Sequence, residues 1–382
     1  MLRSPAMVLF SAWILVRVVA FGAGLYIVLA TLASSLKTVI LPRAVQSRLS
    51  RVIFLSLRNL FDLAAGKNAT YERRDEVLAL YGPLSLLMLL ATWIVLVIAA
   101  YTLMFWAVQG DSVWSAFQLS GSSVFTLGFA APAHFGTTLL VLTEAGIGLI
   151  ELALLITYMP SLYSAFQRRE SLVSLLEVRA GSPPSGVELL LRFQRIHGLG
   201  HLTEEVFEAW ETWFIDVEES HTSMAALPFF RSPQPDRSWI TAAGAVLDGA
   251  ALLRSSVDIE LDPHVDLCLR AGYLSLRRVA DSFRITYDAT PGRDDPIQLS
   301  RQEFDEAYDE LAAGGVPMKP GRDQCWSDFR GWRVNYDTVL IKLTTLLSAP
   351  YARWSSDRAI MTYGSALSQA VRRPFAARQL RR

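Results

Sequence analysis

Cysteine is scarce in this chain of 382 residues, which has only Cys268 and Cys325. Two widely separated cysteines give neither the paired spacing of a zinc site nor the density of a disulfide-stabilised secreted domain. The sequence also has no G-x-G-x-x-G, G-x-S-x-G, H-E-x-x-H or phosphate-binding glycine loop. These absences remove the sequence support for the common nucleotide-binding, hydrolase and zinc-protease classes, and we expect no cofactor, no structural metal and no enzyme activity.

Charge is scarce in the first part of the chain. Through Gln167 there are 10 Lys/Arg and 7 Asp/Glu, against 26 and 29 in the remainder. Three apolar runs lie in this part, and each is long enough to cross a bilayer core. The sequence therefore predicts an all-α membrane protein with three transmembrane helices, at Met7–Ala33, Tyr81–Val108 and Thr137–Phe166.

The distribution of Lys and Arg predicts the orientation of these spans. Ser34–Leu80 holds eight basic and four acidic residues, whereas Gln109–Gly136 holds no Lys or Arg. The positive-inside rule places the first segment in the cytosol and the second outside. We therefore expect a multi-pass protein of the cell (inner) membrane, with the N-terminus outside and the C-terminal domain cytosolic. The first apolar run is too long for a cleaved signal peptide.

Helical periodicity continues through the connector and the C-terminal part, and no strand alternation is visible. Val45–Phe61 predicts an amphipathic helix, either on the inner membrane surface or packed on the cytosolic domain. A short helix at Ser171–Val178 and the breaker Gly181–Gly186 lead into an all-helical cytosolic domain. Its helices are predicted at Val187–His197, Thr203–His221, Ser238–Val257, Pro263–Phe283, Arg301–Ala313 and Gln324–Leu347.

The expected organisation has five parts. The chain ends in a tail with seven arginines and one acid after Tyr351. Such a tail is attracted to anionic membrane lipids, or is a solvated end. The parts are residues 1–33 (first span), 34–80 (connector), 81–167 (second span to third span), 168–350 (helical domain) and 351–382 (basic tail).

A hydroxyl-rich segment separates the second and third spans. Asp111 and Ser112 can cap a short helix at 113–122, which leads into Ser123-Val124-Phe125-Thr126-Leu127-Gly128-Phe129-Ala130. Non-helical backbone at membrane depth is tolerated only when it is buried in protein or lines a water-filled path. The segment therefore predicts a re-entrant loop.

Span, short helix, this loop and span together resemble the pore module of potassium channels, whose pattern is T-x-x-T-V-G-Y-G. Ser123 and Thr126 match its threonines, and Gly128 matches its first glycine. Leu127 and Phe129 replace valine and tyrosine. The resemblance implies a pore helix supported by Ser122 and Ser123, and a selectivity filter at Thr126–Ala130 whose backbone carbonyls replace an ion's hydration shell.

Ala130 is the main departure from the pattern, because the family has glycine there. A residue with a side chain at positive φ costs about 1–2 kcal/mol, so the departure puts potassium selectivity in question. Ala131 also replaces an aspartate that often follows.

The resemblance makes the third span the helix that lines the pore. Gly146 and Gly148 fit either a hinge or a close helix contact. Glu151 faces either an ion cavity or a structural partner such as Arg17, and Glu144, two turns before it, is expected to be structural. Pro160 is expected to kink or end the helix.

One loop per chain implies four copies around an axis. We therefore expect a homotetrameric, potassium-conducting cation channel whose partners are monovalent cations, a second copy of itself and anionic lipids, with no nucleic acid. A non-conducting membrane scaffold or sensor and a membrane-anchored hydrolase are the alternatives. No ladder of arginines occurs in a span, so voltage sensing of the usual kind is not expected.

Three side-chain clusters in the helical domain have competing interpretations. The acids near His197, His201 and His221 are interpreted as a solvated face, and the three histidines are not expected to form a metal site. Trp210, Trp213 and Phe214 are interpreted as core rather than a ligand cage. A third cluster forms ion pairs within the chain or docks on a neighbouring subunit; its members are Arg231, Asp236, Arg237 and Trp239.

Overall fold

The computed structural model describes residues 5–40, 48–66, 70–196, 198–260 and 262–358. All regular structure within them is helical apart from one isolated bridge between Val257 and Met318. The chain forms two compact units. The first unit comprises Met1–Lys67, Leu80–Tyr163 and Met224–Ala226, and the second comprises Asn68–Ala79, Ser164–Ser223 and Leu227–Arg382.

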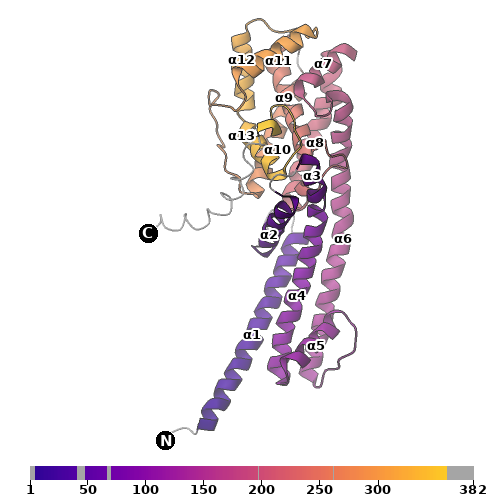
Figure 1. Ribbon diagram of the computed structural model, residues 1–382, viewed down its shortest axis with the longest axis vertical. Helices are drawn as coiled ribbons and strands as arrows, with labels where there is room; N and C mark the ends of the chain where they lie inside the picture. The colour runs from indigo at the N-terminus through magenta and orange to yellow at the C-terminus, as the bar shows by residue number, and fades with distance from the viewer. Residues whose placement is uncertain (1–4, 41–47, 67–69, 197, 261, 359–382) are drawn as a thin grey trace. The chain divides into compact units, whose positions relative to one another are not determined.

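The first unit contains the long apolar helices (Figure 1). Helices α1, α4 and α6 are long and apolar enough to cross a membrane, as the three apolar runs predicted. The short α5 packs against α4. The helices are α1 (Pro5–Val39), α2 (Arg48–Ala65), α4 (Tyr81–Gln109), α5 (Val113–Val124) and the first part of α6 (Phe135–Ala180).

A close approach and one arginine join α1 to α4. A Cβ at Gly24 would lie 2.6 Å from the carbonyl oxygen of Ala100, so glycine is what lets the two backbones meet. Arg17 donates from Nε to Ala107 O (2.6 Å) and from Nη2 to Val108 O (2.8 Å). A cation is favourable there because the last carbonyls of a helix carry partial negative charge.

Helix α6 corrects two predictions. We expected the third span to end near Phe166 and a separate short helix to follow, but α6 is one helix of 46 residues. Pro160 does not end it. No glycine or further proline follows Pro160 until Gly181, whose φ of 82° stops the helix. The predicted breaker is thus confirmed, and the predicted interruption after Phe166 is wrong.

The second unit is built around α9, whose residues are almost all buried. A helix that is apolar all round belongs in the centre of a domain, and α9 contacts α7, α10, α12 and α13. The unit also contains four short turns of other helix types, η1 to η4, at Leu199–His201, Thr203–Phe207, Leu227–Phe229 and Ser356–Arg358. Its α-helices are α3 (Tyr71–Ala79), α7 (Gly186–Ile196), α8 (Glu208–Ser223), α9 (Trp239–Ser256), α10 (Pro263–Ser282), α11 (Arg301–Ala313), α12 (Arg322–Arg333) and α13 (Asp337–Leu347), besides the last part of α6.

Local signals predicted most of these boundaries. Asp262 accepts from the backbone N–H of His264 at the start of α10, and Ser300 with Glu303 forms the predicted capping box of α11. The predicted single helix at Gln324–Leu347 is wrong, because α12 and α13 are separate. Asn335 donates its side-chain amide to the carbonyls of Gly331 and Trp332, and such side-chain bonds to backbone compete with helix continuation.

Helix α3 was not predicted, and it joins the connector to the second unit. Tyr71 donates its hydroxyl to Pro235 O (2.7 Å), and Asp75 forms an ion pair with Arg231. Arg231 also donates to Leu347 O at 3.0 Å. The ion-pair interpretation of Arg231 is therefore the one the chain uses.

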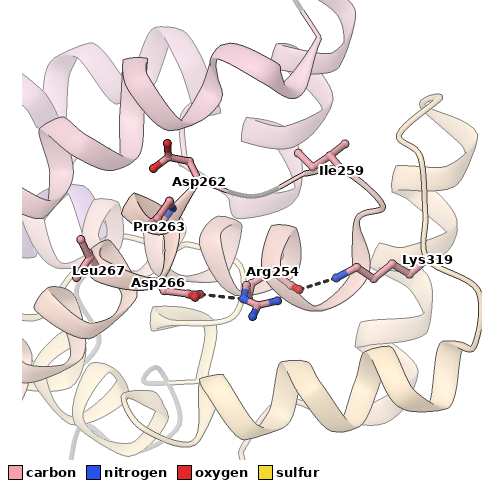
Figure 2. Close-up of a pocket in the computed structure, with 7 residues that line it drawn as sticks. All are labelled: Arg254, Ile259, Asp262, Pro263, Asp266, Leu267 and Lys319. Carbon is pink, nitrogen blue, oxygen red and sulfur yellow. Dashed lines mark hydrogen bonds and ion pairs between the residues drawn. The ribbon is translucent and has the colours of Figure 1, made fainter.

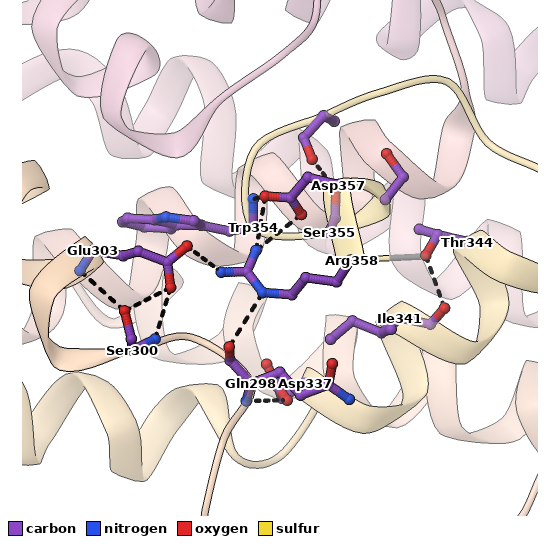
Figure 3. Close-up of polar contacts among 12 residues, drawn as sticks. Gln298, Ser300, Glu303, Asp337, Ile341, Thr344, Trp354, Ser355, Asp357 and Arg358 are labelled. Carbon is purple, nitrogen blue, oxygen red and sulfur yellow. Dashed lines mark hydrogen bonds and ion pairs between the residues drawn. The ribbon is translucent and has the colours of Figure 1, made fainter. Parts of the chain in front are cut away.

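The packed core continues past residue 350, where we expected a basic tail to begin. Trp354 is 2% exposed and belongs to the core of the second unit. Figure 3 shows Arg358 at the centre of the contacts that fix this segment. It pairs with Glu303 of α11 and with Asp357, and it donates to Gln298 O at 3.2 Å. Residues 359–382 of the predicted tail lie outside the described residues.

Candidate functional site

Helix α5 begins where α4 ends and runs back along it. Ser112 caps α5 by accepting from the backbone N–H of Ser115 at 3.1 Å. One turn short of its other end, the Ser120 hydroxyl lies 3.1 Å from the carbonyl oxygen of Ile98. Ile98 is eleven residues before the end of α4, which is about 16 Å along a helix that rises 1.5 Å per residue. This distance from the end of α4 equals roughly half the thickness of a bilayer core of about 30 Å.

The lower end of α5 also contacts α6. A Cβ at Gly148 would lie 2.4 Å from the carbonyl oxygen of Val124, the last residue of α5. Gly148 is thirteen residues after the start of α6, or about 20 Å along it. The structure thus supports the close-contact interpretation of Gly148. Gly146 has no atom within 4 Å of such a Cβ.

The predicted filter segment, Thr126–Ala130, forms the loop that leaves this end of α5. Gly128 has a φ of 72° and Thr126 a φ of 53°, so both lie in the left-handed region. Leu127 and Phe129 are each 63% exposed in the single chain. The loop therefore turns its side chains away from the helices that hold it.

Ala130 does not adopt the strained backbone that the family pattern implied. It is absent from the residues with positive φ, and its N–H donates to the hydroxyl of Ser122 at 3.1 Å. The expected cost of a side chain at this position is wrong for this structure, and Thr126 carries the left-handed conformation instead. Ser122 contacts the loop, and the carbonyl of Ser123 accepts from Thr126 N–H at 3.0 Å while its hydroxyl donates to Leu119 O within α5.

Glu144 lies behind α5 and is fully buried. Its Oε1 forms a hydrogen bond with the Ser120 hydroxyl, and its Oε2 has no hydrogen-bond partner among the described residues. Helix α4 also bonds directly to α6, because the Tyr101 hydroxyl donates to the Thr143 hydroxyl (3.0 Å). The prediction of a structural role for Glu144 fits this position. Ser120 was not singled out from the sequence, although it lies among the hydroxyl residues of the segment.

Glu151 of α6 is buried, with 1% of its surface exposed, and its polar neighbour is Ser35 of α1. Neither of its carboxylate oxygens has a hydrogen-bond partner among the described residues. Arg17, its suggested partner, instead donates to the end of α4. This burial within one subunit favours the structural interpretation of Glu151 over an ion cavity.

The histidines of the second unit do not come together. His221 is buried and accepts at Nε2 from Arg169 (3.2 Å), whereas His201 is exposed. His197 lies outside the described residues. Burial, with the Arg169 charge beside it, holds the pKa of His221 well below its usual range. Among the residues the structure covers, no group of three or more potential ligands could hold a metal.

The aromatic cluster and the cysteines are core. Trp210, Trp213 and Phe214 are at most 3% exposed, and the Trp213 indole donates to Arg169 O at 3.1 Å. The core interpretation is confirmed. Burial raises the pKa of the Cys268 thiol, which makes it an unreactive core residue.

An open pocket of about 530 Å³ lies between the end of α9 and the start of α10 (Figure 2). Its polar groups already have partners within the chain. Arg254 pairs with Asp266 (2.9 Å), Lys319 donates to Arg254 O (2.9 Å), and Asp262 caps α10. The polar groups of the pocket are therefore engaged with one another or with the backbone, and none is left to bind a particular ligand.

The comparisons with known proteins add no relative. No family model, curated protein or solved structure matches the chain.

Proposed function

We propose that the chain is one subunit of a homotetrameric cation channel in the cell membrane, with potassium as the expected ion. The observation that carries the proposal is the path of α5. It descends along α4 to about mid-bilayer depth and releases an exposed, non-helical loop there. We place the N-terminus outside and the second unit in the cytosol, as the charge distribution favours.

The loop supports a pore because lipid cannot cover it. Non-helical backbone at membrane depth must be buried in protein or line water. In the single chain the Leu127 and Phe129 side chains are mostly exposed. Four copies around an axis would enclose the loops and present rings of carbonyl oxygens from Thr126–Ala130 to an ion. The negative end of the α5 dipole would favour a cation below them.

The reversal potential of the purified protein in a planar bilayer tests the proposal. With potassium on one side and sodium on the other, we expect current that reverses at a potential favouring potassium. Current that reverses near zero would support a channel but contradict its selectivity for potassium. An intact tetramer that passes no current under any condition would overturn the channel and favour the non-conducting scaffold.

A matched glycine pair tests whether the loop is the conducting element. A Cβ added at Gly128 or at Gly121 would meet no atom within 4 Å, but only Gly128 has a positive φ. Gly128→Ala would strain the loop by about 1–2 kcal/mol, and we expect it to reduce or abolish potassium current. Gly121→Ala should leave current unchanged. Equal currents in the two variants would contradict a filter at this loop.

A further inference from the structure

Helix α2 packs in the first unit through polar contacts rather than through its leucines. Ser50 is 2% exposed and hydrogen-bonds Thr38 of α1 at 2.8 Å. The carbonyl of Phe54 accepts from the Tyr81 hydroxyl at 3.0 Å. Arg58 is 5% exposed, with its guanidinium over the Tyr81 ring. This face of α2 is therefore committed to α1 and α4.

The opposite face of α2 is uncovered and carries large apolar side chains, with Ser56 and Asn59 among them. Val52, Leu60 and Leu63 are 60%, 59% and 75% exposed. At 3.6 residues per turn they fall within roughly 80° of one another around the helix. The three packed residues, Ser50, Phe54 and Arg58, fall on the other side, roughly 160° to 240° from Val52. The helix is thus arranged with its leucines pointing outward.

Its contacts also fix the level of α2 along the two apolar helices. Thr38 is one residue before the end of α1, and Tyr81 is the first residue of α4. The chain connects the end of α1 to the start of α4 through α2, so both ends lie at the same side of a bilayer that α1 and α4 cross. Helix α2 therefore lies at the boundary between hydrocarbon and headgroups.

We propose that α2 is an interfacial helix whose Val52–Leu60–Leu63 face inserts into the lipid bilayer. At this level, acyl chains and glycerol backbones are the apolar material available to cover three large side chains. Buried charge on the inward face and apolar side chains on the outward face suit lipid and not water. The proposal needs the chain to sit in a membrane, and it does not depend on whether the pore conducts.

Nitroxide scanning in vesicles of phosphatidylethanolamine and phosphatidylglycerol tests the inserted face. Each residue from Arg51 to Leu63 is replaced in turn by cysteine in the full chain and spin-labelled. The native Cys268 and Cys325 are buried, and the unsubstituted chain checks that they stay unlabelled. Collision with oxygen reports hydrocarbon, and collision with a nickel chelate reports water. Size-exclusion elution matching the unsubstituted chain shows that each variant is folded.

Leu60 is the decisive position, and Arg51, which lies roughly 180° from it around the helix, is its control. At Leu60→Cys we expect oxygen accessibility several-fold above nickel accessibility, and at Arg51→Cys we expect a several-fold lower ratio. Across the scan, the two accessibilities should vary with helical period and in opposite phase. High nickel accessibility at Leu60 would mean water and would overturn the proposal. Exclusion of both reagents there would mean that protein covers the face, from the second unit or another copy, and would equally overturn it.

Discussion

The Ser120 hydroxyl has one proton to donate and two oxygen atoms within hydrogen-bond distance. This limits the protonation state of Glu144. The hydroxyl lies 3.1 Å from Ile98 O and also bonds Glu144 Oε1. If the serine donates to the carbonyl, the Glu144 side must supply the second hydrogen. An uncovered carboxylate charge is costly at a site with no exposed surface, whereas a neutral donor completes the chain of bonds.

We therefore expect Glu144→Gln to keep nearly all of the stability of the protein. Glutamine has the same shape and supplies a donor to Ser120. Glu144→Ala should lower the free energy of unfolding by about 1–3 kcal/mol, because it leaves buried polar groups without partners. The midpoint of thermal unfolding in detergent, followed by circular dichroism, measures both. If Glu144→Gln lowers the midpoint as much as Glu144→Ala does, the protein requires an ionised Glu144, and the prediction of a neutral side chain is contradicted.

His221 predicts acid sensitivity of the second unit. Its Nε2 accepts from Arg169, so its hydrogen is on Nδ1, which lies 3.0 Å from the Ser220 hydroxyl. Burial and the Arg169 charge lower its pKa in the folded protein. The unfolded chain takes up a proton near pH 6.5 while the folded protein does not. The stabilisation is complete above pH 6.5 and decreases below it, by at most about 1.4 kcal/mol per pH unit from this group.

Thermal unfolding at pH 7.5 and pH 5.5 measures this loss, and two histidine variants assign it. His221→Gln should reduce the difference between the two pH values, since it removes the titrating group and keeps an acceptor for Arg169. His264 is the control, because it is only half-buried and its hydrogen bond with Glu211 raises its pKa. His264→Gln should not reduce the acid loss. A difference that is unchanged in His221→Gln would assign acid sensitivity elsewhere.

The sequence located the loop but misplaced its strained residue. Hydroxyl residues and Gly128 between two apolar runs were enough to predict the non-helical segment that the structure has at Thr126–Ala130. The family pattern then assigned positive φ to position 130, whereas Thr126 adopts it. The Ser122 hydroxyl that holds Ala130 N–H is a tertiary contact, and no local rule predicts which side chain meets which amide.

Helix α6 makes close contact with α5 at Gly148. Gly148→Ala would place a Cβ 2.4 Å from Val124 O, which is backbone and cannot move alone. We expect it to lower the free energy of unfolding by about 1–3 kcal/mol, as overpacking does. Gly146→Ala is the matched control, because its Cβ meets nothing within 4 Å and alanine favours a helix over glycine by up to about 1 kcal/mol.

Thermal unfolding in detergent compares the two glycine variants with the unsubstituted protein. The prediction for Gly148 holds if its midpoint falls while that of Gly146→Ala stays or rises. A fall in both would make general helix disturbance the cause. A fall in neither would mean that α5 and α6 separate freely at this point, and the support of the loop by α6 would then be lost.

Helix existence was predictable where apolar periodicity is long, and helix ends were predictable where a breaker stands. The apolar runs predicted α1, α4 and α6, and Gly181 predicted the end of α6. The expected end of the third span near Phe166 was wrong, and Arg169, just beyond it, is buried and bonded to Glu170 and Leu227 O. Helix α3 was missed because it is nine residues long and polar, and its stability comes from Asp75 and Tyr71 contacts far away in sequence.

The oligomeric state expected for the whole molecule follows from the loop of the first unit. This loop is held from one side by Ser122, and the side chains of Leu127 and Phe129 remain exposed. In a bilayer the non-helical backbone of these residues needs protein or water around it. Each chain has one such loop, and a closed ring of carbonyl oxygens needs four.

We therefore expect purified protein to contain four copies of the chain. Native mass spectrometry from detergent should give four times the mass of one chain, and stepwise photobleaching of a single fluorophore per chain in sparse vesicles should show up to four steps. A potassium-type filter is built from four loops, and closed rotational symmetry places one loop from each of four chains at equal distance around its axis. A stable dimer or monomer with unchanged unfolding would remove the enclosure that the loop needs, and with it the channel. Four copies that pass no current would instead mean an assembled pore that does not conduct. That outcome favours the non-conducting scaffold.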